Sequence, residues 1–355
     1  MVFRMLVLNL GSTSTKFAVY EGLEEKLYQS ISHSKDELDC FNQLWDQKNF
    51  RKEKIYQTLK ENQYEMKDFH IIACRGGNIK PVKGGIYLLN EDMLADIRSE
   101  KYGSHPCGIG NVIAYEFGLE NNISVIFADP PMTDELCNFA KYSGIMEITR
   151  VSSGHALNQK RTGRRIAAEY GKRYEDMNFI IAHLGGGISV GAHQKGMIID
   201  MNNALDGDGP FSPERAGTLP AGDLIRMCYS GKYSQGEMLK KVKGEGGLVS
   251  YLGTNSGLDV EERIASGDEE AQEAYEAMSY QISKEIGAVS TVLKGEVDAI
   301  ILTGSLAYSQ KLNDWINERT RFIAPIHICP GENEMISLVE SALRYLTGEE
   351  QAREY

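Results

Sequence analysis

The sequence LVLNLGSTSTKFAVY at residues 6–20 decides the fold, because the chain repeats its design later on. The second copy is FIIAHLGGGISVGA at residues 179–192. Each copy has an apolar run, one polar residue, Leu-Gly, a turn of small residues and the start of a second strand. Small residues tolerate the unusual backbone dihedral angles of tight turns, so the pattern predicts two β-hairpins, one in each half of the chain.

The tip of the first hairpin has the chemistry of a phosphate site. Backbone N–H groups, the hydroxyls of Ser12 and Ser14 and the ammonium group of Lys16 can all donate hydrogen bonds to phosphate oxygens. A single hairpin of this kind would be interpreted as an ordinary turn. Two matched copies instead suggest a cleft that holds a polyphosphate from both sides.

Other phosphate and hydrolase motifs do not fit the sequence. No segment has the Gly-x-x-x-x-Gly-Lys-Ser/Thr pattern of a Walker A loop. The glycine-rich run at residues 185–191 misses the Gly-x-Gly-x-x-Gly spacing and continues as a strand, which disfavours a Rossmann dinucleotide turn. The serines lack a Gly-x-Ser-x-Gly elbow, which argues against a serine hydrolase.

Composition narrows the class of protein further. The chain has 355 residues, enough for two domains, and 25% charged with 42% hydrophobic residues is typical of a globular protein. The net charge of −12 argues against nucleic acid or an anionic membrane as a partner. Its 6 cysteines form no Cys-x-x-Cys pair, which indicates reduced thiols rather than disulfides or a zinc site. The apolar run before Asn9 is too brief for a signal peptide and no run reaches membrane-spanning length, so we expect a cytoplasmic protein.

Apolar, β-branched runs alternate with helical patterns, which indicates an α/β protein. The predicted strands are Met5–Leu10, Phe17–Tyr20, Phe69–Cys74, Ser124–Ala128, Phe179–Leu184, Ser189–Ala192, Met197–Asp200 and Asp298–Thr303. The predicted helices are Asp92–Ser99, Ile109–Phe117, His155–Glu169, Gly222–Tyr229, Glu269–Leu293 and Glu334–Leu346. We expect one domain over residues 1–150 and a second over 151–334, with the C-terminal helix in 335–355 packing back on the first.

Several single residues stand where chemistry could occur. Arg75 directly follows an apolar strand, and an arginine there can bind a carboxylate or phosphate through two parallel hydrogen bonds, although a surface arginine in a turn is an equal alternative. Asp129 also ends a strand, where a structural cap is the simpler interpretation. His183 lies beside the glycines of the second hairpin and His105 could reach a cleft, but a lone histidine is more often structural, and no spacing suggests a transition-metal site.

Two longer segments could bind a ligand. Residues 206–220 mix glycine, proline and charge in the manner of a binding loop or lid, and Arg215 is its best anion ligand. A calcium loop is the rival interpretation, but the later acidic residues of an EF-hand are missing. At the end of the strand 298–303, Gly304 and Ser305 would let a nucleotide base or ribose approach the backbone, unless they form only a tight turn.

Four motifs together make the chain resemble the acetokinase family, within the acetate and sugar kinase/Hsp70/actin superfamily. They are NLGSTSTK at residues 9–16, HALNQK at 155–160, HLGGGIS at 183–189 and NALDGDGPFSPER at 203–215. The resemblance covers essentially the whole chain and is closest to members that act on butyrate. It implies two ribonuclease-H-like (actin-like ATPase) domains with mixed sheets flanked by helices, an active site in the cleft between them, and a homodimer or a higher homo-oligomer. It also implies reversible, Mg²⁺-dependent phosphoryl transfer between ATP and a fatty-acid carboxylate, which gives an acyl phosphate and ADP.

The resemblance also implies roles for individual residues. Those near the nucleotide would be Asn9, Ser12, Ser14, Lys16, Gly185, Gly186, Gly187, Gly304 and Ser305. Those that act on the reacting groups would be Arg75, Asp129, His183 and Arg215, and Glu334 would meet magnesium. The acyl substrate would contact Arg75, Gly76, Gly77, His105 and Arg215.

The nature of the acyl group follows less directly from the residues. Acetate kinases carry bulkier residues after the arginine that matches Arg75, so Gly76 and Gly77 predict room for a four-carbon chain. Butyrate is the leading substrate, with isobutyrate, acetate or propionate as alternatives, because one methylene is worth only about 1–3 kcal/mol in such a pocket. An ATP-gated interaction protein of the actin or Hsp70 type is the non-enzyme alternative.

Overall fold

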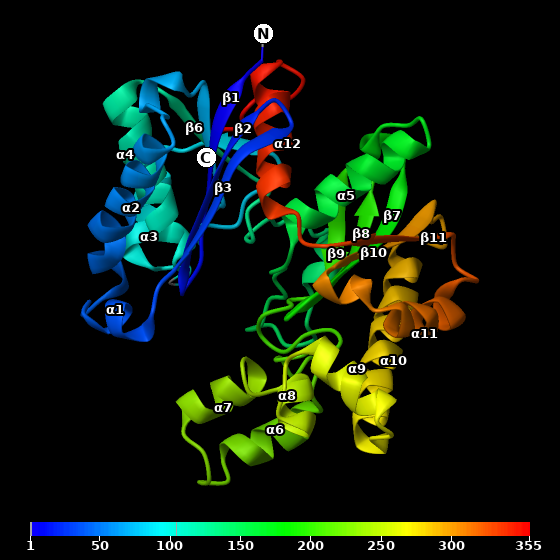
Figure 1. The fold of residues 1–355 in the computed structure, drawn as a ribbon. Helices are drawn as coiled ribbons and strands as arrows, with labels where there is room; N and C mark the ends of the chain where they lie inside the picture. The colour runs from blue at the N-terminus through cyan, green and yellow to red at the C-terminus, as the bar shows by residue number, and fades with distance from the viewer. Residues whose placement is uncertain (1, 104) are drawn as a thin grey trace. The chain divides into compact units, whose positions relative to one another are not determined.

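The computed structural model describes residues 2–103 and 105–355, which fold as two compact units (Figure 1). The first unit joins the residues up to Thr133 to Asn333–Tyr355, and the second spans Asp134–Glu332. The sequence placed the division near residue 150. Residues 134–150 instead join the second unit, where their backbone is bonded: the Cys137 N–H donates to the Ile199 carbonyl at 2.8 Å.

The first unit is a mixed six-stranded sheet of order β3-β2-β1-β4-β6-β5 with helices on both faces. Its strands are β1 Arg4–Leu10, β2 Ser14–Glu21, β3 Glu24–Ser32, β4 Ile71–Cys74, β5 Ile86–Leu88 and β6 Ser124–Ala128. Its helices are α1 Lys35–Asp39, α2 Gln47–Glu61, α3 Glu91–Ser99, α4 Cys107–Asn121 and α12 Glu334–Leu346. Strands β1, β4 and β6 are parallel, so their carboxyl ends meet at one edge of the sheet.

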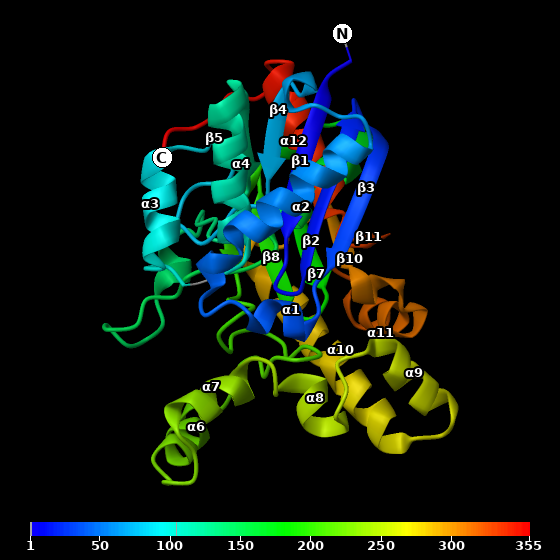
Figure 2. The ribbon, with the colours of Figure 1, turned by 60° about the vertical axis from the view of Figure 1, so that its left-hand side comes forward.

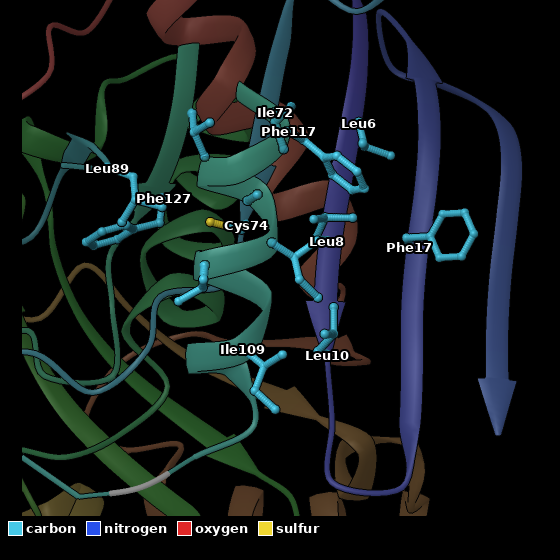
Figure 3. Packing of buried hydrophobic residues seen from close by; sticks show 14 of the residues in the cluster. Leu6, Leu8, Leu10, Phe17, Ile72, Cys74, Leu89, Ile109, Phe117 and Phe127 are labelled. Atoms are coloured by element: carbon cyan, nitrogen blue, oxygen red, sulfur yellow. The ribbon is translucent and has the colours of Figure 1, made fainter. Parts of the chain in front are cut away.

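Side-chain alternation along β1 explains the two layers of helices. Leu6, Leu8 and Leu10 share one face and pack with Ile109 and Phe117 of α4 in a fully buried core (Figure 3). The residues between them point to the other face, where α12 packs against β1 and β4. A strand buried on both faces needs a continuous apolar sequence, which this one has.

The second unit repeats the plan with a five-stranded sheet of order β11-β10-β7-β8-β9. Its strands are β7 Asn178–Leu184, β8 Ile188–Gln194, β9 Met197–Met201, β10 Ala299–Gly304 and β11 Ile326–Pro330. Its helices are α5 Ala156–Glu169, α6 Ala221–Cys228, α7 Gln235–Val242, α8 Gly247–Leu252, α9 Gly257–Ala265, α10 Glu269–Val292 and α11 Gln310–Thr320. The helices α6–α9 follow β9 and precede α10 in chain order, and all four lie in the lower part of the view in Figure 2.

Alternation along β7 again separates two helical layers. Ile180 and Ala182 face the long helix α10, while Phe179 and Ile181 pack with Ile166 of α5. Each strand and helix that the sequence predicts is present, with ends that differ by a few residues. The two α/β units with mixed sheets flanked by helices confirm the predicted fold class. No helix in residues 2–103 and 105–355 is both long and apolar enough to span a membrane.

Candidate active site

The first predicted hairpin is formed by β1 and β2. Asn9 pairs with Lys16 across the antiparallel strands, so their side chains share one face of the sheet. Ser12 is exposed at the tip, and Ser14 begins β2. The structure therefore places the four residues predicted to contact phosphate on one hairpin.

Asn9 and Arg75 both contact Glu334 at the carboxyl edge of the first sheet. Its Nδ2 donates to Glu334 Oε2 at 2.6 Å, and Arg75 Nη1 lies 3.2 Å from Glu334 Oε1. Arg75 follows β4, its N–H donates to the Leu8 carbonyl of β1 at 3.0 Å, and Glu334 is the first residue of α12. Three segments far apart in sequence thus bring an amide, a guanidinium and a carboxylate together.

A magnesium ion that arrives with a nucleotide fits this arrangement. Mg²⁺ in nucleotide enzymes usually takes one or two protein carboxylates and completes its shell with phosphates and water. Glu334 supplies one carboxylate at this edge. Within the part of the chain that the structure describes, no group of three or more His, Cys, Asp or Glu residues could hold a metal ion. The donor set therefore suits a nucleotide-bound ion better than a site made wholly of protein ligands.

Asp129 and His105 lie at the same edge. Asp129 follows β6, is 2% exposed, and adopts a φ of +42°, while its Oδ1 accepts from the Gly85 N–H at 2.8 Å. His105 precedes α4, where Cys107 Sγ donates to the Leu10 carbonyl at 3.3 Å and ties the helix start to the end of β1. A non-glycine residue at positive φ is uncommon and marks Asp129 as a constrained position.

The two glycines after Arg75 are explained by close packing. A Cβ on Gly76 would lie 2.9 Å from Pro130 Cβ, and one on Gly77 would lie 2.6 Å from Asn111 Oδ1. The protein's own core fills the space that the missing side chains leave. The prediction that these glycines open room for the acyl chain is therefore wrong, although their backbone atoms can still contact a substrate.

The second hairpin holds His183 in a defined tautomer. Asn158 Nδ2 donates to the carbonyl oxygens of Gly331 at 3.3 Å and Glu332 at 2.7 Å, which leaves Asn158 Oδ1 facing His183 Nδ1 at 2.8 Å. Since an amide oxygen only accepts, Nδ1 carries the proton. The Nε2 atom of the neutral ring is then an acceptor, and only the imidazolium form can donate from it. His155 stacks on His183, with ring centroids 3.7 Å apart.

The glycine turn of this hairpin lies against Arg215. A Cβ on Gly187 would lie 2.0 Å from Arg215 Nη1, so a side chain there would displace the Arg215 guanidinium. Arg215 Nη1 donates to the Ala204 carbonyl at 2.7 Å, while its buried Nε has no hydrogen-bond partner among the described residues. Burial lowers the pKa of Arg215, and nearby carboxylates oppose that effect only in part. A partly buried guanidinium that retains some exposed surface is suited to an anionic ligand.

A cavity of about 510 Å³ adjoins Gly185 and Gly186. Its walls include Gly257, Tyr275 and Ser305, so the predicted nucleotide residues at 185, 186 and 305 line one space. Gly304, just before Ser305, has a φ of +89°, and a Cβ there would lie 2.3 Å from the Leu184 carbonyl oxygen. The turn after β10 therefore requires glycine, and the cavity has the size of small-molecule sites.

Three residues that the sequence analysis gave no role support this site. Asn158 lies in the motif at residues 155–160, Asn111 lies on α4, and Arg51 lies on α2. Asn111 Nδ2 donates to the Arg75 carbonyl at 2.9 Å, and Arg51 Nη1 donates to the Gly11 carbonyl of the first hairpin at 2.9 Å. Only the motif around Asn158 gave a signal in the sequence.

Comparison with known proteins identifies the family. The family model described as the acetokinase family matches residues 141–313. Butyrate kinase 2 of Clostridium acetobutylicum is 47% identical over 355 residues, with 100% of each chain covered. The chain belongs to the acetokinase family. A probable butyrate kinase of Clostridium botulinum is 45% identical over 100% of both chains. The acetate kinase of Porphyromonas gingivalis, at 16% identity, has the same fold with a TM-score of 0.78 over 96% of this chain and 99% of that chain.

Proposed function

We propose that this acetokinase-family protein phosphorylates butyrate, in the reversible reaction butanoate + ATP ⇌ butanoyl phosphate + ADP. The observation that carries the proposal is 47% identity over the whole chain to a protein named butyrate kinase 2. The two hairpins, one on each sheet, and the cavity beside the second hairpin supply sites for phosphates and for adenosine.

The chemistry asks little of a general base. A carboxylate is ionised at neutral pH, so one of its oxygens can attack the γ-phosphorus directly. A new bond forms between the γ-phosphorus and the carboxylate oxygen. The bond between the γ-phosphorus and the β–γ bridging oxygen breaks, and its electron pair leaves on that oxygen as part of ADP. The protein must align two anions, reduce their repulsion and stabilise the charge on the transferring phosphoryl group.

Residues of the first unit would hold the acceptor and the phosphates. Arg75 binds the acyl carboxylate or the transferring group, with Asn9 and Lys16 near the phosphates. Asp129 orients the substrate or a water molecule from its constrained position after β6. Glu334 would hold magnesium, which when bound supplies positive charge to the phosphate oxygens.

Residues of the second unit would stabilise the transferring group and the nucleotide. Because Asn158 holds the proton on Nδ1, His183 would donate from Nε2 to the transferring group only when the ring is protonated. Arg215, whose side chain is partly exposed, offers its guanidinium to an equatorial phosphoryl oxygen. The cavity beside Gly186 and Ser305 accepts adenosine. We also propose a cytoplasmic homodimer, as the family resemblance implies, which sedimentation analysis can test.

The test is formation of acyl phosphate, trapped as the hydroxamate, with acetate, propionate, butyrate, isobutyrate and valerate in parallel. We expect the largest kcat/KM with butyrate. A maximum with isobutyrate, acetate or propionate would keep the chemistry and reject butyrate as the preferred substrate. ATP binding without product from any acid would reject the kinase and favour the interaction-protein alternative.

A further inference from the structure

A buried arginine lies under the tip of the first hairpin. Arg51 of α2 has no exposed surface and ranks among the largest fully buried side chains in the described residues. Its Nη1 donates to the carbonyl oxygens of Gly11 at 2.9 Å and Ser14 at 3.0 Å. Its Nη2 donates to the Ser12 carbonyl at 2.8 Å. One side chain thus binds the backbone of nearly the whole turn from the inside.

The remaining carbonyl of the turn is also bonded internally. The Thr13 carbonyl accepts from the His33 N–H at 2.8 Å, and the Ser14 carbonyl also accepts from the Gly11 N–H at 2.9 Å. Every carbonyl oxygen from Gly11 to Ser14 therefore has a donor within the protein. Carbonyl oxygens carry partial negative charge and would repel a phosphate, so their inward orientation clears the outer face of the tip.

The outer face of the tip offers donors instead. Ser12 and Thr13 are exposed, and in the described part of the chain their N–H groups have no protein acceptor. Their hydroxyls lie on the same two residues. Backbone N–H groups and hydroxyls, with the carbonyls turned away, form a donor surface that can bind an anion.

No carboxylate within residues 2–103 and 105–355 forms an ion pair with Arg51 or raises its pKa. Its only side-chain amide partner is Gln47, whose Oε1 accepts from Nε at 3.1 Å and from Nη2 at 2.9 Å. Burial lowers the pKa of Arg51, and no carboxylate opposes that effect. The pKa of neighbouring His33 is lowered first by burial and next by the charge of Arg51. Arginine nevertheless stays protonated in proteins, so a full positive charge lies beneath the tip.

We propose that Arg51 is a positioning residue for the nucleotide phosphates, which orients the donors of the Gly11–Ser14 tip and adds an uncompensated positive charge beneath it. The inference rests on the proposed function, because it takes the phosphates of ATP as the ligand of this hairpin. Arg51 touches no substrate and acts through the turn. If Arg51 had only a structural role, its hydrogen bonds would hold the turn together and its positive charge would not affect the affinity for ATP.

The decisive variant changes the charge and keeps the shape. Gln47→Glu preserves the Oε1 acceptor and places a carboxylate against Arg51, which neutralises it. We expect the Kd and KM for ATP to rise about tenfold, because charges near a partly buried site interact strongly. The KM for butyrate should stay within about twofold and the melting temperature should not fall, since the new ion pair is hydrogen-bonded.

Gln63→Glu is the matched control, because Gln63 is exposed just beyond the other end of α2. It adds the same charge to the chain and should leave the Kd for ATP unchanged. Arg51→Lys keeps the positive charge but loses the planar guanidinium group that donates to three carbonyl oxygens of the turn. It should therefore lower kcat and raise the KM for ATP together. If Arg51→Lys does not fold, the pair of glutamine variants still decides the question.

Wild-type protein that fails to bind ATP would reject the proposed function itself. Wild-type protein that binds ATP, together with a Gln47→Glu variant of unchanged affinity, would overturn the inference and leave the proposed function standing. A rise in the Kd for ATP that Gln63→Glu reproduces would also overturn it, because the effect would then reflect the overall charge of the chain.

Discussion

The Gly77→Ala variant tests whether the turn after β4 positions Arg75. The added methyl would lie 2.6 Å from Asn111 Oδ1, 3.3 Å from Gly108 Cα and 3.4 Å from Ile97 Cδ1. Ordinary contacts begin near 3.4 Å, so the amide or the turn must move by about 0.8 Å. Asn111 resists this movement, because its Nδ2 donates to Cys74 Sγ at 3.0 Å and to the Arg75 carbonyl at 2.9 Å.

The expected cost follows from these contacts. Overpacking of a buried site costs about 1–3 kcal/mol, and one lost hydrogen bond adds about 1 kcal/mol, so the free energy of unfolding should fall by about 2–4 kcal/mol. Because the same amide holds the backbone of Arg75, kcat/KM for butyrate should fall at least about tenfold. Urea denaturation and the hydroxamate assay measure the two effects.

Gly287→Ala provides the control for this variant. Gly287 lies inside α10, and a Cβ there would meet no atom within 4 Å. Alanine should therefore stabilise the helix by about 0.5–1 kcal/mol without changing kcat/KM. The reasoning is refuted if Gly77→Ala matches the wild type within about 0.5 kcal/mol and retains full activity.

Three further predictions follow from the site and the core. Arg75→Ala and Arg215→Ala should each lower kcat by about a hundredfold or more with a native circular dichroism spectrum, and unchanged turnover would reject their roles. Gly257→Leu should fill the cavity beside the second hairpin and raise the KM for ATP but not for butyrate; equal effects on both would place adenosine elsewhere. Burial, followed by the charge of Asp208, raises the pKa of Glu285, so the folded state binds this proton more tightly than the unfolded chain. Protonated Glu285 stabilises the folded state fully below the ordinary glutamate pKa, and this stabilisation is lost as the pH rises through the raised pKa of the folded state. Glutamine resembles the protonated form at every pH, so Glu285→Gln should raise the melting temperature at pH 7 and not at pH 4.

The predicted elements are those with a clear apolar pattern. Strands such as β1 and β7 are buried on both faces and read as continuous apolar runs. The sequence pattern did not predict β3, an edge strand of sequence EEKLYQSIS with largely exposed side chains, or β5, which has only 3 residues. It also missed α2, whose sequence QKNFRKEKIYQTLKE buries few side chains and shows no broad apolar stripe.

The positions of the candidate site residues were predictable where these residues directly follow strands. Arg75 and Asp129 could be found because parallel strands end at one edge, which the strand order alone implies. Arg51 could not be found, because its partners in the hairpin lie up to 40 residues away along the chain and tertiary packing alone joins them. Glu334 was chosen from the sequence, but its hydrogen bond with Asn9 could not be predicted, because the two residues lie 325 positions apart.

The glycines after Arg75 show why absence of a side chain is ambiguous in a sequence. A glycine can leave space for a ligand or allow the protein to pack closely, and the sequence is the same in both cases. Here the Cβ directions of Gly76 and Gly77 point into Pro130 and Asn111. The acyl preference therefore depends on the likeness to butyrate kinases and on direct measurement.

Phosphorus NMR of a single reaction mixture tests the central claim most directly. The protein is mixed with ATP, Mg²⁺ and butyrate, and the spectra are followed over time. Phosphoryl transfer to the carboxylate predicts an acyl phosphate resonance that grows in step with ADP and disappears when hydroxylamine is added. ADP that accumulates with inorganic phosphate alone, or ATP that persists unchanged, would contradict the account.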